Sequence, residues 1–435
     1  MLKQPKLREI FAADFGDRVV HHILVDYLEK VWEPLFIYDS YACRKAKGTH
    51  SAVKRLQAFM RKVSRNGTRR AYFMQLDIRG FFLHINKEVL YQIIAKRIRD
   101  ETLLWLARTV IFHDCTKNFV LKGKRDLPAK IPPHKTLFDT ENKRGLPIGN
   151  LASQFFSNVY LNELDQFVKH HLKAKYYVRY SDDFVLLHDE KEGLLGWREE
   201  IKKFLESRLR LALNEGRQAI GPINNGVDFL GYIVRPDYLL LRRRVVNRLK
   251  GRLVWYQKRL IGLKEDCTVF RFDQAALEKL RATWSSYMAH TKVANTYRLR
   301  EKLLGRFAWL RRFFEQDRGR LKWRGEAPAS LYNLKRQYRF FLRKCRGSIL
   351  FFLVGRFFEF YDGQAERALG LLGLKTIAPR SGFQIRCGFP VNLQQRYLRR
   401  LVRLGLAVHV VREEESWLSG VKKRSIAESW IPASQ

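Results

Sequence analysis

Hydrophobic and polar positions follow two different periods along this chain, and each change of period marks a new segment. Residues 1–70 repeat apolar positions at helical spacing and end in a basic turn. "RAYFMQLDI" (70–78) is a short apolar run that predicts a buried strand with Asp77 at its tip. Residues 84–113 return to helical spacing. We therefore expect an α+β fold in which a carboxylate stands at the end of a strand.

The middle of the chain predicts a long helix followed by a hairpin. A glycine turn leads into "GLPIGNLASQFFSNVYLNELDQFVKHHL" (145–172), an amphipathic helical pattern. "YYVRY" and "FVLLH" then flank Ser-Asp-Asp as two strands around a tight turn, so Asp182 and Asp183 stand side by side at its tip. Like charges about 4 Å apart cost roughly 4 kcal/mol at an effective dielectric constant near 20. We expect a cation to neutralise them.

From residue 241 to 347 the pattern is helical and strongly basic. This segment has 29 Lys and Arg against 8 Asp and Glu. A charge run of this kind is often only a solvated face. Here aromatic residues such as Trp255 and Tyr256 are interleaved with charge of one sign, which favours a surface that grips a nucleic-acid backbone. "KWRGEAPAS" (322–330) predicts a linker, and the tail from about 348 mixes strands and helices with little excess charge.

The composition of the chain indicates which class of partner the protein binds. A chain of 435 residues with 46% hydrophobic content can fold as two or three globular domains, and its formal net charge of +40 favours a polyanion. No stretch approaches the roughly 18 apolar residues of a membrane span, and the N-terminus has no apolar core of a signal peptide. We expect a cytoplasmic protein that makes no membrane contact. Its five scattered cysteines are expected to be reduced.

Three carboxylates at two strand tips carry the candidate chemistry. Asp77 can meet Asp182 and Asp183 across a sheet, although the two strands are far apart in the sequence. Hard oxygen ligands suit Mg²⁺, and two such ions about 3.5–4 Å apart can clamp the attacking and leaving oxygens of a phosphoryl transfer. The alternative is an exposed Asp-Asp turn with no ligand.

The order of the surrounding motifs favours the metal site, because it resembles that of the reverse transcriptase family. "QLDIRGFF" is similar to its first catalytic motif, "GLPIGNLASQ" to its nucleotide-pocket motif, "YSDD" to its catalytic hairpin and "VDFLGYIV" to its primer-grip hairpin. All four occur in the family's order within roughly residues 35–235. The resemblance implies a right-hand polymerase with fingers, a palm built on an antiparallel sheet, and a helical basic thumb.

With the tail, this resemblance implies five parts. They are N-terminal helices and fingers (1–70), a palm with a fingers insertion (71–240), the thumb (241–321), a linker and basic helix (322–347) and a small C-terminal α/β domain (348–435).

The resemblance also implies roles for single residues. Asp77 and Asp182 would be the principal metal ligands, with the backbone carbonyl of Ile78 as a third and Asp183 in support. The cofactor would be two Mg²⁺ ions, for which Mn²⁺ could substitute. Phe82 would block the 2′-hydroxyl of an incoming ribonucleotide and so select deoxynucleotides. The alternative is that the Phe82 ring only packs in the core.

Further positions form the implied nucleotide pocket and primer grip. Arg44 and Lys47 would hold the incoming triphosphate, or else lie on a solvated surface. The other implied contacts are Ile148, Gly149, Gln154 and Arg217 for the nucleotide, and Phe229, Leu230 and Gly231 for the primer. Arg217 stands where many members carry a lysine thought to protonate pyrophosphate. Because arginine does not readily give up a proton, we interpret Arg217 as electrostatic support, or as a sign that the general acid is weak or elsewhere.

Within the family, the chain is most similar to the reverse transcriptases of diversity-generating retroelements. "SYACRKAKGTHSAV" (40–53) and "SYMAHTKVANTYRLR" (286–300) resemble that branch. Most other branches have Gln at position 148 and Pro at position 154, whereas this chain and that branch have Ile148 and Gln154. The branch is error-prone at template adenines, and an apolar Ile148 removes a polar contact that separates right from wrong nucleotides. The implied partners are a template-repeat RNA, an RNA–DNA hybrid with its primer, and dNTPs.

The tail is similar to the N-terminal mismatch-sensing domain of the MutS repair family. "ILFFLVGRFFEFYDGQAERALGLLGL" begins a resemblance over about 349–431, in which Phe357 and Glu359 fall on the Phe-x-Glu pair. The ring would wedge into a base stack and the carboxylate would contact the displaced base; the alternative is a core phenylalanine in an unrelated α/β domain. The sequence has no phosphate-binding G-x-x-x-x-G-K-[ST] loop, so the MutS ATPase is absent. Some diversity-generating retroelements have a MutS-like accessory protein, so the resemblance implies that the tail is such an accessory fused to the polymerase. Whether a separate accessory protein is a further partner stays open.

Two other functions stay open. The enzyme could make cDNA for antiphage defence, as retron-like reverse transcriptases do. The chain could also be a non-catalytic protein that binds nucleic acid or mismatches through its tail, although the complete set of three aspartates argues against this.

Overall fold

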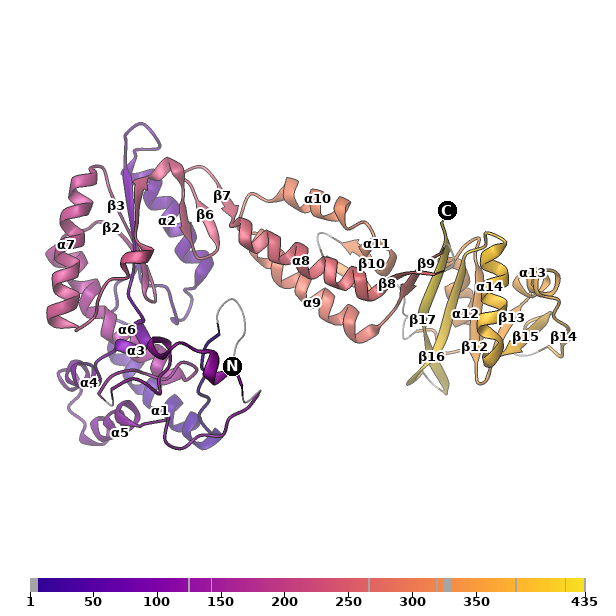
Figure 1. The fold of residues 1–435 in the computed structure, drawn as a ribbon, viewed down its shortest axis with the longest axis horizontal. Coiled ribbons are helices and arrows are strands. Elements are labelled where there is room, and N and C mark those ends of the chain that lie inside the picture. Colours follow the sequence, from indigo (N-terminus) through magenta and orange to yellow (C-terminus); the bar gives the residue numbers. More distant parts are fainter. Residues whose placement is uncertain are drawn as a thin grey trace. The chain divides into compact units, whose positions relative to one another are not determined.

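The structure is a computed structural model, and it describes residues 7–123, 126–141, 143–264, 267–317, 320–323, 330–379, 382–418 and 420–433. It divides into two compact units, residues 1–242 and 243–435. Figure 1 shows the elements of each.

Unit 1 is built on a four-stranded antiparallel sheet in the order β2-β3-β1-β4. The strands are β1 (Tyr72–Asp77), β2 (Tyr176–Tyr180), β3 (Asp183–His188) and β4 (Ala219–Pro222). The strand predicted over 70–78 is therefore confirmed as β1. The hairpin predicted around Ser-Asp-Asp is confirmed as β2–β3, with Ser181 at φ +57° in its turn.

Helices cover both faces of this sheet. In Figure 1, α7 and α2 lie on opposite sides of the β2–β3 hairpin. The helices are α1 (Phe15–Trp32), α2 (Thr49–Val63), α3 (Phe81–His84), α4 (Lys87–Ala95), α5 (Glu101–Phe112), α6 (Leu151–Gln166, followed by a π turn over Phe167–His171) and α7 (Lys191–Arg208). Short 3-10 turns span Pro128–Lys130, Pro133–Lys135, Glu215–Arg217 and Ile223–Asn225.

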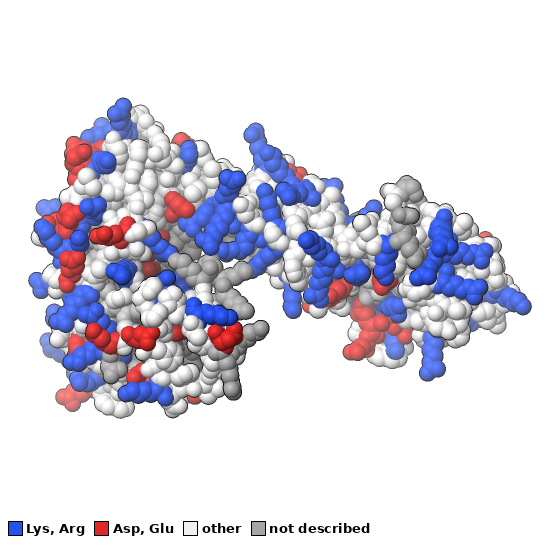
Figure 2. All heavy atoms as spheres, viewed as in Figure 1, with Lys and Arg blue, Asp and Glu red and all other residues white. Residues whose placement is uncertain are grey.

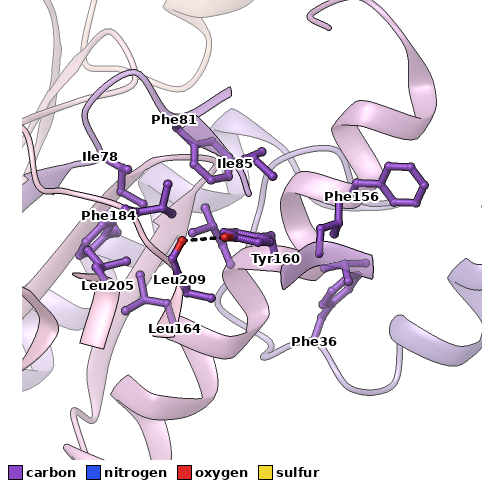
Figure 3. Packing of buried hydrophobic residues seen from close by; sticks show 14 of the residues in the cluster. Phe36, Ile78, Phe81, Ile85, Phe156, Tyr160, Leu164, Phe184, Leu205 and Leu209 are labelled. Atoms are coloured by element: carbon purple, nitrogen blue, oxygen red, sulfur yellow. Dashed lines mark hydrogen bonds between the residues drawn. The ribbon is translucent and has the colours of Figure 1, made fainter. Parts of the chain in front are cut away.

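Helix α6 is more buried than its sequence predicts. Most of its residues are buried, at positions around the whole helix, so the amphipathic pattern expected over 145–172 is wrong for α6. The reason is that α6 lies inside the core, packed against α1 as well as α4 and α7. Figure 3 shows Phe156, Tyr160 and Leu164 of α6 among these core residues. The Tyr160 hydroxyl donates a hydrogen bond to the Leu209 carbonyl at 2.6 Å.

Three short antiparallel strands complete unit 1. They are β5 (Val227–Phe229), β6 (Tyr232–Val234) and β7 (Leu239–Leu241). Leu230 and Gly231 form the β5–β6 turn with φ of +52° and +91°, the sign that a tight hairpin turn requires at both central residues.

Unit 2 begins with the basic segment, which is only partly helical. It contains α8 (Arg243–Leu260), β8 (Ile261–Lys264), β9 (Cys267–Arg271), α9 (Gln274–Thr291), α10 (Tyr297–Arg306), α11 (Leu310–Phe313), β10 (Phe314–Asp317), β11 (Arg320–Trp323) and α12 (Leu334–Lys344). The helical pattern expected over 241–347 is wrong at its four strands, two of which are held by a sheet formed with the tail. Most of the expected linker, residues 324–329, lies outside the described residues.

The tail adds six strands to this sheet. Its elements are β12 (Ile349–Val354), β13 (Phe357–Tyr361), α13 (Gly363–Leu372), β14 (Thr376–Ile377), β15 (Arg386–Pro390), the 3-10 turn Val391–Leu393, α14 (Gln394–Arg403), β16 (Val408–Leu418) and β17 (Val421–Pro432). The order is β14-β15-β13-β12-β16-β17-β9-β8. Because β9 pairs with β17, the segment expected to be thumb and the tail share one sheet.

Many of the basic residues of the segment 241–347 are exposed on the surface of unit 2. Figure 2 shows Lys and Arg side chains gathered in the region of α8 and α10, with few Asp and Glu among them on the visible face. Across the described residues, no helix combines the length and apolar character that crossing a membrane requires.

Candidate active site

The three predicted carboxylates come together at one end of the unit 1 sheet. In the β1–β3 ladder Asp77 stands directly opposite Asp183. The backbone N–H of Ile78 donates a hydrogen bond to the carbonyl of Asp182 at 3.3 Å, which ties the end of β1 to the hairpin turn. The convergence expected from the sequence is therefore present in the structure.

Burial and mutual repulsion disfavour the charged form of the hairpin carboxylates. Burial, followed by the charge of Asp77, raises the pKa of Asp182 above its usual range. Burial raises the pKa of Asp183 to about 7, and the charges of Asp182 and Asp77 act in the same direction. A cation at this point would relieve that repulsion and favour the ionised carboxylates.

Asp77 is held by two residues of the loop before β4. The Asn214 side-chain amide donates to Asp77 Oδ2 at 2.7 Å, and the Asn214 backbone N–H donates to the Asp77 carbonyl at 2.8 Å. Arg217 Nη1 lies 3.6 Å from the same Oδ2. The sequence singled out Arg217 but not Asn214, whose only signal is its place three residues earlier in "LNEGRQ".

Asp183 is held by Gln75, which sequence reasoning also missed. The Gln75 amide donates to Asp183 Oδ1 at 2.9 Å and to the carbonyl of Asp228 at 3.2 Å. Residues two apart on a strand share a face, so the position of Gln75 before Asp77 was the available signal. Through Asp228 the contact links β5, the strand that leads to the turn of Leu230 and Gly231, to the site, and the next residue, Phe229, is fully buried.

These oxygen donors suit a divalent metal ion in type. Among the described residues, however, no three Asp, Glu, His or Cys side chains already form a metal-binding group. In this arrangement Asp77 Oδ2 accepts a hydrogen bond from Asn214, and Asp183 Oδ1 accepts one from Gln75. A magnesium ion of a nucleotide site takes only one or two protein carboxylates and fills its shell with phosphates and water, so the residues present fit such an ion.

The residues of the predicted nucleotide pocket lie under an N-terminal segment. The Phe11 backbone N–H donates to the Ile148 carbonyl at 2.8 Å. Gly149 has φ +129°, and a Cβ there would stand 2.5 Å from the Phe11 carbonyl oxygen, so only glycine fits. Gln154 is exposed on the first turn of α6. No motif or pattern in the sequence pointed to this covering segment.

Phe82 and the two basic fingers residues are engaged in internal contacts. The Phe82 ring packs edge-on against Phe81, with centroids 5.3 Å apart, and is partly buried. Arg44 is nearly buried, with a two-pronged ion pair to Glu33. The Lys47 ammonium lies 3.4 Å from the Tyr38 ring centroid and donates to the Tyr38 carbonyl. A role for Arg44 or Lys47 with the triphosphate stays a prediction and requires these contacts to break.

The Phe-x-Glu pair of the tail is divided between the surface and the interior. Phe357 is 48% exposed, so the reading of it as a core residue is wrong. Glu359 is only 3% exposed, and its carboxylate accepts hydrogen bonds from Arg386 at 2.7 Å and from the Tyr361 hydroxyl. In this conformation Glu359 is an internal anion, and contact with a displaced base would require this network to open.

Residues 2–234 match the family model of reverse transcriptase (RNA-dependent DNA polymerase), which is more than half of the chain. The chain belongs to the reverse transcriptase family. Members are RNA-directed DNA polymerases and generally use divalent metal ions. Residues 333–434 of this reverse transcriptase match MutS domain I.

Two curated relatives of the reverse transcriptase each match more than half of this chain. Protein YkfC of Escherichia coli (strain K12) is 26% identical over 280 residues, which are 56% of this chain and 68% of YkfC. The group II intron-encoded protein LtrA of Lactococcus lactis subsp. cremoris is 24% identical over 342 residues, 64% of this chain and 53% of LtrA. The chain thus spans about half the length of LtrA.

Two further matches are to a mismatch repair protein and to a solved structure. DNA mismatch repair protein MutS of Clostridium tetani is 32% identical over 104 residues, 23% of this chain and 12% of that protein. Among solved structures, apo telomerase from Candida tropicalis, truncated from its C-terminal domain, matches with a TM-score of 0.37 and 13% identity. That match covers 52% of this chain and 45% of that one.

Proposed function

We propose that this reverse transcriptase copies RNA into DNA at Asp77, Asp182 and Asp183, with two magnesium ions. The observation that carries the proposal is the β1–β3 register, which places Asp77 opposite Asp183 and beside Asp182 at one sheet end. The primer 3′-hydroxyl attacks the α-phosphorus of the incoming dNTP, and pyrophosphate leaves. Bound divalent ions would activate the attacking oxygen and neutralise charge on the leaving group.

The residues of the chain have separate tasks in this reaction. Asp77 and Asp182 supply the metal-binding oxygens, and Asp183 supports them. Arg217, 3.6 Å from Asp77, adds positive charge where pyrophosphate forms. It acts as a fixed charge, because a guanidinium stays protonated.

The polymerase is error-prone: it copies a template-repeat RNA, and the cDNA carries substitutions opposite template adenines. Ile148 and Gln154 support this proposal, because an apolar side chain and a missing proline alter the wall of the nucleotide pocket. Fewer polar contacts to the nascent pair reduce the difference in transition-state binding between right and wrong nucleotides. The cDNA then diversifies a target gene, as in diversity-generating retroelements.

The tail contacts the nucleic acid rather than the nucleotide. Phe357 is an exposed ring at the start of β13 and can stack on or insert between bases, at the cost of a few kcal/mol of unstacking that is smallest at a mispaired step. The buried Glu359 takes no part in this contact unless the network around it opens.

The deciding experiment is primer extension by purified full-length protein on an RNA template with Mg²⁺, followed by sequencing of the products. Wild type should extend the primer, and Asp77→Asn and Asp182→Asn should each lose at least about 100-fold in rate. No extension on any template would leave the non-catalytic binder as the better reading. Extension with equal fidelity at all template bases would instead favour a reverse transcriptase that makes cDNA for another purpose, such as defence.

A second comparison tests the origin of the errors. Ile148→Gln restores a polar side chain beside the nascent pair and should lower misincorporation at template adenines by several-fold. Ile377→Gln serves as control, since it makes the same substitution at an exposed position in β14 of unit 2. An unchanged error spectrum would remove Ile148 as the cause.

A further inference from the structure

Arg179, three residues before Asp182, is fully buried in β2 and uses all five of its N–H donors. Nε and Nη2 donate to the two carboxylate oxygens of Asp165, at 2.7 and 2.6 Å. Nη1 donates to the Asn158 side-chain oxygen and to the Ser181 carbonyl, both at 3.2 Å. Nη2 donates in addition to the Ser40 hydroxyl at 3.0 Å. Five hydrogen bonds exhaust what a guanidinium can donate.

These partners come from three separate parts of unit 1. Asp165 and Asn158 lie on α6, the helix that follows the nucleotide-pocket motif. Ser40 belongs to the segment that leads to Arg44. Ser181 is the turn residue of the catalytic hairpin, next to Asp182.

Hydrogen bonds to backbone groups also join the fingers segment to the hairpin and to α6. The Arg179 N–H donates to the Asp39 carbonyl, and the Tyr41 N–H donates to the Arg179 carbonyl, each at 3.0 Å. On α6, the Asn158 amide donates to the Ala42 carbonyl at 2.9 Å. Residues 39–42 are thus held against both the hairpin and α6.

Stability alone does not explain a buried ion pair of this kind. Removing two charges from water offsets much of their attraction, and well-packed apolar residues often serve as well. What the guanidinium adds is direction, because its planar fork fixes several partners at once. Ser181 needs such support, since a non-glycine residue at φ +57° occupies a sparsely populated region of backbone conformation.

We infer that Arg179 is a positioning residue for catalysis: through the Ser181 carbonyl it sets the hairpin turn that presents Asp182, and through Asp165 and Ser40 it links that turn to α6 and to the fingers segment. This inference rests on the proposed catalytic role of Asp182.

The test is the kinetics of Arg179→Lys in the full-length chain. Lysine keeps the charge but presents its donors at a single point, so it cannot serve Asp165 and Ser181 together. We expect kcat to fall by about 10- to 100-fold, the loss typical of a displaced catalytic group. The KM for dNTP and the Kd for a primed RNA template should change by less than about 2-fold. The Mg²⁺ concentration for half-maximal rate should rise, which a purely structural residue would not cause.

Two controls keep the result interpretable. Arg208→Lys makes the same change at an exposed position of α7 and should leave all four quantities unchanged. If Arg179→Lys fails to fold, Arg179→Met with Asp165→Asn removes both charges and keeps an acceptor for the Tyr177 hydroxyl, which now donates to Asp165 at 2.8 Å. That double variant should fold and show the same loss of kcat.

Wild-type kcat and metal dependence in either folded variant would overturn the inference. The outcome for the catalytic aspartate is separate: an active Asp182→Asn would overturn the proposed site itself. An inactive Asp182→Asn beside a fully active Arg179→Lys would overturn only the role of Arg179.

Discussion

Asn214 holds Asp77 by two hydrogen bonds, one from its side-chain amide and one from its backbone N–H. The side-chain bond fixes the Asp77 carboxylate next to the carboxylates of Asp182 and Asp183. Because the amide is neutral, it can orient Asp77 without competing for the charge that a metal ion would need.

Asn214→Ala should therefore lower polymerase activity more than stability. The backbone bond to the Asp77 carbonyl remains, so the free energy of unfolding should fall by only about 1 kcal/mol, the usual value of one hydrogen bond. The rate of primer extension should fall about 10-fold because the carboxylate is free to rotate. Asn224→Ala, at an exposed position nearby in sequence, is the matched control. Equal rates in the two variants would contradict the role of Asn214.

Arg217 should contribute to the reaction but not to folding. Its side chain is half exposed, and exposed ion pairs add little to stability. We expect Arg217→Ala to slow extension several-fold with an unchanged melting temperature, and Arg217→Lys to retain most of the rate. A lysine variant that is faster than wild type would instead indicate that a proton donor at this position speeds the reaction, a task that Arg217 does not perform.

The sequence predicted the parts of this site that lie in continuous motifs. Asp77, Asp182 and Asp183 stand at the ends of apolar runs, so periodicity placed them at strand ends, and the order of the surrounding motifs favoured a metal site over an exposed turn. Periodicity could place Gln75 on the same face as Asp77 but could not show its bond to Asp183, because that contact comes from antiparallel pairing with β3. Asn214 could not be found that way, because it acts from a loop that returns to Asp77. The helical pattern predicted over 241–347 was wrong at β8 and β9 for the same reason. These two strands belong to a sheet in which β9 pairs with β17 of the tail.

Val269 should stabilise the tail, although it lies in the segment expected to be thumb. It is buried in a core cluster together with Ile349 and Phe351, and it pairs with Trp430 of β17. Val269→Ala should cost about 1 to 3 kcal/mol of unfolding free energy. Limited proteolysis should then cut first within 333–434. Val254→Ala, on the exposed surface of α8, is the control, and equal protection in the two variants would argue against a shared sheet.

Glu359 should behave as a stabilising residue and Phe357 as a binding residue. Glu359→Ala leaves the Arg386 guanidinium without its carboxylate in a largely buried place, which should cost about 2 to 4 kcal/mol. Phe357→Ala should change stability by less than about 0.5 kcal/mol, as at most exposed positions, but weaken binding to a mismatched duplex. Urea unfolding and a binding titration separate the two. A stable Glu359→Gln variant that loses only mismatch binding would reverse this assignment.

His409 should make unit 2 less stable as the pH falls. Burial, with the charge of Arg312, lowers the pKa of His409 from 6.5 to about 4, and its Nδ1 lies 2.6 Å from the Ser429 hydroxyl. Below about pH 6.5 His409 is protonated in the unfolded chain, whereas in the folded chain it stays neutral until about pH 4. The contribution of neutral His409 is therefore intact at pH 7 and decreases between pH 6.5 and 4, by about 1 to 2 kcal/mol at pH 5.

Urea unfolding of the full chain at pH 7 and pH 5 measures this effect. His409→Gln keeps a hydrogen-bonding group toward Ser429 but cannot titrate, so the difference in unfolding free energy between the two pH values should be smaller than in wild type. His134→Gln removes a histidine from an exposed position of unit 1 and should leave that difference as it is in wild type. The same pH dependence in wild type and His409→Gln would mean that the high net charge of the chain, rather than His409, governs its stability in acid.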